Sequence, residues 1–167
     1  MAKEIINKID KANLITLDVG SLAPNKKIQT IDLAEWLEEG GIIRESSFKD
    51  KLKKMEISDF NRAYVSVFCS KNAIIPPWAY LLIQVKLRNI AKEVFFCDKK
   101  TMKIILFERN LKAMDMSCYK DKRVFLKGCT NKEFPLLYSS LCVTALGSTV
   151  KSLFYGEPCS NVLLIKN

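Results

Sequence analysis

The sequence predicts an α/β protein with a mostly parallel sheet, built from two repeated βαβ units with helices on both faces. The first observation is internal similarity: segments 63–98 and 122–160 each read as strand, Cys-Ser or Cys-Thr turn, proline-initiated helix, strand and acid. The second is that a βαβ unit makes its two strands parallel through a right-handed crossover. The third is that the runs 94–96 and 153–155 are wholly apolar, as is typical of strands covered on both faces.

The size of the chain fits one domain, since it has 167 residues and a mass of 19.1 kDa, and 49% of its residues are hydrophobic. We therefore expect a single domain over 1–167. Its expected parts are an N-terminal α+β segment (1–62), the first βαβ repeat (63–98), a connecting helix and loop (99–121), and the second βαβ repeat (122–160).

The N-terminal segment contains two β-rich runs, 14–17 and 28–31, which predict short strands. Asp32 and Glu35 have the spacing of a capping box and predict a short helix that ends at Gly40-Gly41. A second helix is predicted by apolar residues at helical spacing: Phe48, Leu52 and Met55.

The repeat itself rests on two alignments of the chain with itself. Segment 64–70 aligns with 124–130 at an offset of sixty residues, which matches Cys69-Ser70 with Cys129-Thr130. After one deleted residue the offset becomes fifty-nine, and Pro76 meets Pro135. The alignment predicts helices over 77–90 and 135–146, where a proline in the first turn costs no hydrogen bond. A linking helix within 100–115 would make all four strands parallel.

The composition excludes several kinds of chemistry and of partner. Because the chain has no histidine, imidazole-based triads, H-E-x-x-H zinc sites and histidine proton shuttles are excluded. The net charge of +9 lies in 63–167 and comes mainly from lysine, with 22 Lys against 5 Arg in the chain, so we expect no nucleic-acid partner. The longest apolar stretch, 73–85, is too short and too interrupted to cross a membrane. With no secretory signal at the N-terminus, we expect a cytoplasmic protein with reduced thiols.

Three thiols follow predicted strand ends, where open parallel sheets bind ligands. They are Cys69, Cys129 and Cys159, and each stands next to a short polar residue: Ser70, Thr130 and Ser160. Neighbouring strands lie ~4.8 Å apart, so such thiols could share one ion at metal–sulfur distances of ~2.3 Å. We therefore expect a metal site, for zinc or an iron–sulfur cluster, with Asp98 or Glu157 as auxiliary ligand.

The same residues allow other functions. In a second hypothesis one of these thiols is the nucleophile of a thiol-redox or persulfide-transfer enzyme, and another resolves the intermediate. In a third, the cysteines belong to the core of an interaction module with a protein partner. We assign Cys142 to helix packing and Cys118 to no role, while Cys97 has Gly156 as its counterpart in the repeat.

Three motifs each contain a cysteine followed by a short polar residue. They are Cys69-Ser70 followed by Ala73-Ile74-Ile75-Pro76 and Trp78-Ala79-Tyr80, then Lys127-Gly128-Cys129-Thr130-Asn131-Lys132, then Tyr155-Gly156-Glu157-Pro158-Cys159-Ser160. Together they closely resemble an uncharacterised bacterial family catalogued as domain of unknown function 2480. The resemblance spans nearly the whole chain and implies a cytoplasmic protein whose genes tend to lie near iron–sulfur assembly genes. Asn72 stands where relatives are expected to carry an acid.

Overall fold

The computed structural model describes residues 14–128 and 136–167, which divide into two compact units. Unit 1 comprises 14–24, 104–128 and 136–167, and unit 2 comprises 25–103. Unit 2 is thus inserted in the sequence of unit 1. The two βαβ segments predicted from the sequence lie in different units, the first in unit 2 and the second in unit 1.

Each unit contains strands, an α-helix before its central strand and another after it. The elements of unit 1 are β1 (Leu14–Asp18), η1 (Val19–Leu22), η4 (Ser117–Tyr119), β5 (Arg123–Lys127), α5 (Leu136–Leu146), β6 (Ser152–Glu157) and β7 (Ser160–Lys166). Those of unit 2 are β2 (Ile28–Asp32), η2 (Leu33–Trp36), α2 (Glu45–Lys54), η3 (Ser58–Phe60), β3 (Tyr64–Phe68), α3 (Pro77–Leu87) and β4 (Glu93–Phe95). Helix α4 (Lys99–Lys112) begins in unit 2 and continues into unit 1.

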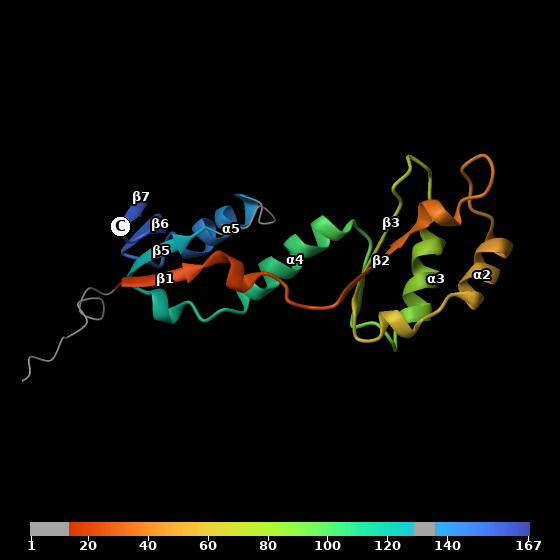
Figure 1. Cartoon of the computed structure of the whole chain (residues 1–167), viewed down its shortest axis with the longest axis horizontal. Coiled ribbons are helices and arrows are strands. Elements are labelled where there is room, and N and C mark those ends of the chain that lie inside the picture. The colour runs from red at the N-terminus through yellow and green to blue at the C-terminus, as the bar shows by residue number, and fades with distance from the viewer. Residues whose placement is uncertain (1–13, 129–135) are drawn as a thin grey trace, which may run out of the picture. The chain divides into compact units, whose positions relative to one another are not determined.

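The strands form one sheet in each unit. Unit 1 has the order β1-β5-β6-β7, in which only the β6–β7 pair is antiparallel, and unit 2 has the parallel order β2-β3-β4. Figure 1 shows β1 beside β5 and β2 beside β3. The α/β class and the mostly parallel strands are confirmed, with the strands divided between two sheets. The two strands of the N-terminal segment each supply the first strand of a sheet.

The predicted elements are largely present. The strands at 14–17 and 28–31 are confirmed as β1 and β2, the helix with Phe48 as α2, and the linking helix as α4. The helix predicted after Asp32 is a single 3₁₀ turn, η2, whose first turn is capped by the Asp32 carboxylate. Strand β7 was not predicted.

The two units share one backbone plan at a constant offset of fifty-nine residues. Val65 pairs with Val94 in unit 2, and Val124 pairs with Leu153 in unit 1. Before the central strand, the unusual left-handed residues Arg62 (φ 55°) and Asp121 (φ 58°) occupy equivalent turns. Their N–H groups donate to the carbonyls of Ile90 and Thr149, at 2.8 and 3.0 Å.

This register corrects the offset of sixty used for the strand alignment. A slip of one residue moves every side chain of a strand to the opposite face of the sheet. Val65 and Val67 in unit 2, and Val124 and Leu126 in unit 1, are all fully buried in the cores under the helices, as the offset of fifty-nine requires. In this register Cys69 is equivalent to Gly128, and Cys129 to Ser70.

Each unit has its own apolar core between its helices and one face of its sheet. In unit 1, Phe107 of α4 and Cys142 of α5 join Val124 and Leu153 in one buried cluster. In unit 2, Phe48 of α2 and Ile83 of α3 join Val65 in another. Successive right-handed crossovers in one direction place both helices on the same face. The sequence predicts helices on both faces of one sheet. Instead, each of the two sheets has its own pair of helices, and both helices of a pair cover the same face.

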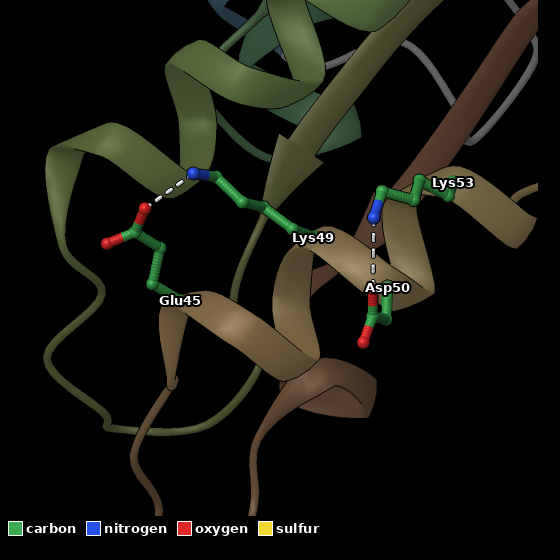
Figure 2. A network of polar contacts seen from close by, with 4 residues as sticks. All are labelled: Glu45, Lys49, Asp50 and Lys53. Atoms are coloured by element: carbon green, nitrogen blue, oxygen red, sulfur yellow. Dashed lines mark hydrogen bonds and ion pairs between the residues drawn. The ribbon is translucent and has the colours of Figure 1, made fainter.

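The two sides of helix α2 account for the amphipathic pattern of its sequence. Its buried side carries Phe48 and Leu52, and its solvent side carries two ion pairs, drawn in Figure 2. Lys49 pairs with Glu45 at 2.6 Å and Lys53 with Asp50 at 3.3 Å. Such exposed pairs stabilise a helix by only a few tenths of a kcal/mol, roughly, so the buried side of α2 determines where the helix packs.

Among the helices of the described residues, none is long and apolar enough to span a lipid bilayer.

Candidate functional site

At the carboxyl ends of the strands in unit 2, Asp32 connects two loops. It is the last residue of β2, and its Oδ1 accepts hydrogen bonds from the Ala34 N–H and the Ser70 N–H, both at 2.9 Å. Partial burial acts to raise the pKa of this carboxyl, but the hydrogen bonds from Ser70 and Ala34 outweigh it, and the pKa is lowered. The ionised carboxylate therefore fixes the turn that follows β3.

Cys69 lies in that turn and is half-buried. It packs against the apolar core of unit 2, and its Sγ donates to the carbonyl oxygen of Lys71 at 3.2 Å. The pKa of Tyr80 is raised, first by burial and then by the nearby Cys69. The Sγ contact with a backbone carbonyl and the apolar neighbours of Cys69 favour a packing role for this residue.

Asp98, the predicted auxiliary ligand of unit 2, caps helix α4. Its Oδ1 accepts from the N–H groups of Lys100 (2.8 Å) and Thr101 (3.0 Å), and its Oδ2 accepts from the Thr101 hydroxyl (2.7 Å). Hydrogen bonds from Thr101 are the largest cause of its lowered pKa. Because both carboxylate oxygens bind the first turn of the helix, Asp98 acts as an N-cap.

The corresponding edge of unit 1 has different side chains. Lys127, at the end of β5, forms an ion pair with Glu157, at the end of the neighbouring strand β6, with 3.1 Å between Nζ and Oε1. Gly128 follows at once, and a Cβ placed there would lie 2.3 Å from the hydroxyl oxygen of Tyr155. The tyrosine ring thus takes the space that a side chain at 128 would need.

Cys159 lies in the tight turn between β6 and β7 and is exposed. Gly156 shapes this hairpin, because its φ is +115° and an added Cβ would lie 2.4 Å from the Ser160 carbonyl oxygen. The Asn161 amide donates to the carbonyl oxygens of Glu157 and Pro158, at 3.2 Å each. The turn therefore holds Cys159 at the carboxyl end of β6, with Ser160 beginning β7.

Cys129 and Thr130 lie outside the described residues, so the predicted convergence of Cys69, Cys129 and Cys159 stays a prediction. Cys69 belongs to unit 2 and Cys159 to unit 1. Within residues 14–128 and 136–167, no group of three or more Cys, Asp or Glu side chains could hold a metal ion. The described residues alone thus do not form a complete metal site.

The remaining cysteines have the following positions. Cys142 is fully buried in α5, where burial raises the pKa of its thiol to about 11, as its assignment to packing predicted. Cys118 is exposed, and its Sγ lies 3.3 Å from the Asp115 carbonyl oxygen. Cys97 is half-buried, and burial is the main cause of its raised pKa.

Sequence reasoning missed a further feature, the exposed apolar strand β7. Val162, Leu163 and Leu164 have exposed fractions of 63%, 50% and 43%. The signal was available in the sequence, since the run 162–165 is apolar and lies only four residues beyond Pro158.

A family model for proteins of unknown function, DUF2480, matches residues 3–167. Comparisons with curated proteins and with solved structures give no match. The motifs that carry the resemblance include the turn after β3, the end of β5 and the β6–β7 hairpin, which are the strand ends described above. Because the match covers essentially the whole chain, the protein belongs to the DUF2480 family of proteins of unknown function.

Proposed function

We propose that this protein acts through a pair of thiols in unit 1, Cys129 and Cys159, in thiol–disulfide or persulfide exchange. The observation that supports it is topological. Cys129 follows the end of β5 and Cys159 the end of β6, and these two strands are hydrogen-bonded neighbours that run parallel. The carboxyl ends of neighbouring parallel strands meet at one edge of a sheet, which is where such sheets carry their functional residues.

Cys159 is the better candidate for the attacking thiol because it is exposed on a hairpin turn and accessible to a partner's sulfur. Its thiolate attacks one sulfur of a disulfide substrate, which forms a mixed disulfide and releases the first substrate thiolate. The Cys129 thiolate then attacks Cys159 Sγ, which releases the second substrate thiolate and leaves a Cys129–Cys159 disulfide. Two electrons pass from the pair to the substrate.

The strand register argues against Cys69 as one of three equivalent ligands. The alignment of Cys69 with Cys129 suggested three equivalent ligands, whereas the register makes Cys69 equivalent to Gly128. Cys69 also differs from Cys159 in surroundings, since its Sγ donates to a backbone carbonyl and it packs against an apolar core. A thiol pair needs only two sulfurs from one unit.

A metal or cluster site built on the same thiols is the second proposal. Glu157, two residues before Cys159, supplies a carboxylate at this edge, although it pairs with Lys127. Zinc and iron–sulfur clusters need about four ligands. The remaining ligands would have to come from Cys69, from water or from a partner protein.

Trapping with oxidised glutathione tests the proposed exchange. The full-length reduced protein should reach a Cys129–Cys159 disulfide with little lasting adduct. The Cys129→Ser variant should keep a stable glutathione adduct on Cys159, because no second thiol resolves it. Cys69→Ser is the matched control and should behave as the unsubstituted protein does. A lasting adduct on Cys159 in the unsubstituted protein would contradict the exchange.

Anaerobic purification with metal and labile-sulfide analysis separates the two proposals. Metal that is retained by the unsubstituted protein and lost from both Cys129→Ser and Cys159→Ser would favour the metal site. Loss of metal from Cys69→Ser as well would restore the three-cysteine set.

A further inference from the structure

The outer edge of β7 is long, apolar and without a neighbouring strand among the described residues. Of its seven residues only Ile165 is partly buried, and all the others are exposed. An exposed edge strand presents unpaired N–H and C=O groups to any strand that can lie beside it, and proteins usually protect such edges with charge, proline, a β-bulge or short length. The pairing of β7 with β6 shifts register between Leu153 and Phe154, which leaves 160–163 as the regular part of the edge. Here Lys166, at the end of the strand, is the only charged residue.

A groove of about 690 Å³ runs between α5 and β7 on one side of this strand. It is lined by Leu136 and Val143 of α5, Tyr155 of β6, and Val162 and Leu164 of β7. Leu136 has an exposed fraction of 82%. The apolar surface on this face thus extends from the strand to the helix.

On the opposite face of β7 the exposed apolar residue is Leu163. Leu163 does not line the groove, although half of its surface is exposed. A small apolar molecule in the groove would cover Val162 and Leu164 but leave Leu163 in water. A strand placed along the edge covers side chains on both faces and also pairs the free backbone groups.

We propose that the occupant is the β7 strand of a second copy of this chain, paired antiparallel so that the two sheets become one. Each sheet has four strands, and the dimer would have a continuous sheet of eight. The two-fold axis of such a pair is perpendicular to the sheet, so both α5 helices lie on the same face and the two grooves adjoin. This interface closes on itself and does not lead to fibres.

The charge of the chain favours this edge over other surfaces for self-association. At a net charge of +9, two copies repel each other through most of their lysine-rich surface. The segment 160–165 has no charged residue, so it can approach its own copy without placing like charges opposite each other.

The register of the pair follows from the hairpin. Ser160 pairs with Glu157 across the turn, and in an antiparallel ladder successive residues point their backbone groups alternately inward and outward. Asn161 and Leu163 therefore point their N–H and C=O groups away from β6. The pairing of β7 with β6 shifts register just beyond Leu163, so the regular part of the edge is 160–163. A two-fold axis at Val162 keeps the pair within this part and sets Asn161 of one copy opposite Leu163 of the other.

Sedimentation velocity of the full-length protein over a range of concentrations tests the dimer. Leu163→Lys should raise the dimer Kd at least about tenfold, because it places one lysine from each copy inside the short contact around the axis. Ile74→Lys, at a 94% exposed residue of unit 2, is the matched control and should leave the Kd unchanged. Added salt should strengthen the dimer by screening the repulsion.

Hydrogen exchange measured at low and high protein concentration gives the register. The amides of Asn161 and Leu163 should become protected as the dimer forms. A monomer at all concentrations, or a dimer that Leu163→Lys leaves intact, would overturn the proposal. A monomer that carries an apolar molecule in native mass spectrometry would overturn it in favour of a small ligand in the groove.

Discussion

Units 1 and 2 have the same core and different edges. The strand register, the left-handed turn before the central strand and the buried phenylalanine of the preceding helix, Phe48 or Phe107, recur at an offset of fifty-nine residues. At the strand ends the two units differ. Unit 2 has Cys69 in a turn held by Asp32, whereas unit 1 has Gly128 under Tyr155 and continues into a hairpin that carries Cys159. The repeated core determines the fold, and the differing loops carry the side chains of the proposed thiol chemistry.

Removal of one buried phenylalanine from each core has the largest expected effect, and it tests whether the two cores are equivalent. Phe48→Ala and Phe107→Ala each remove a ring that is at least 99% buried, at equivalent positions of α2 and α4. Each should lower the free energy of unfolding by about 3–5 kcal/mol. Urea unfolding measures the loss in free energy of unfolding, and hydrogen exchange shows in which unit the backbone amides lose protection.

If the cores are separate, Phe48→Ala should expose unit 2 first and Phe107→Ala unit 1 first. Equal loss of protection in both units for either variant would contradict the division into two cores.

Gly128→Ala tests why unit 1 lacks a side chain where unit 2 has Cys69. The added Cβ would lie 2.3 Å from the Tyr155 hydroxyl oxygen, so the ring must move, at a cost of about 1–3 kcal/mol. In unit 2 the equivalent ring, Phe96, packs against Tyr80, with 5.4 Å between ring centroids. The cost should nearly vanish in a Tyr155→Ala background. The same cost in both backgrounds, by urea unfolding, would show that the tyrosine is not the cause.

Asp98→Ala tests the helix cap that unit 2 has in place of the hairpin. Loss of the cap of α4 should cost about 1 kcal/mol. Because the folded pKa of Asp98 is lowered, its stabilising effect is present above the unfolded value near 3.8 and is lost as the pH falls through the folded value. The difference in unfolding free energy between the variant and the unsubstituted protein should therefore shrink below about pH 4. A difference that does not change with pH would contradict a role for the ionised carboxylate.

The smallest effect is expected at the ion pair of unit 1. Lys127 and Glu157 are both about half exposed, so Lys127→Gln should change stability by about 1 kcal/mol or less, and less still at high salt. Thermal unfolding at two salt concentrations measures this. A larger loss that persists in salt would mean that the pair does more than join two strand ends.

Much of the fold could be predicted from the sequence because the signals were local. Apolar runs, prolines at the helix starts and the spacing of Phe48, Leu52 and Met55 predicted β1, β2, α2, α3 and α4. The division into two sheets could not be predicted, since β1 pairs with β5 across more than a hundred residues and no local pattern records such pairing.

The candidate site was predicted only in part. The strand-end rule led to Glu157 and Cys159 at the end of β6, whereas Asp98 lies three residues beyond β4 and caps α4. The supposed match of Cys69 with Cys129 came from aligning identical residue types, whereas burial on alternating positions sets the register. The buried pairs Val65 with Val124 and Val67 with Leu126 already fit an offset of fifty-nine in the sequence.

Disulfide mapping after limited oxidation is the most direct test of the account. The full-length reduced protein is treated with a small excess of a disulfide oxidant, the free thiols are blocked, and linked peptides are identified by mass spectrometry. The account predicts a link between Cys129 and Cys159, with Cys69 recovered as a blocked thiol. A link from Cys69 to either of them, or no link between Cys129 and Cys159, would contradict a thiol pair confined to unit 1.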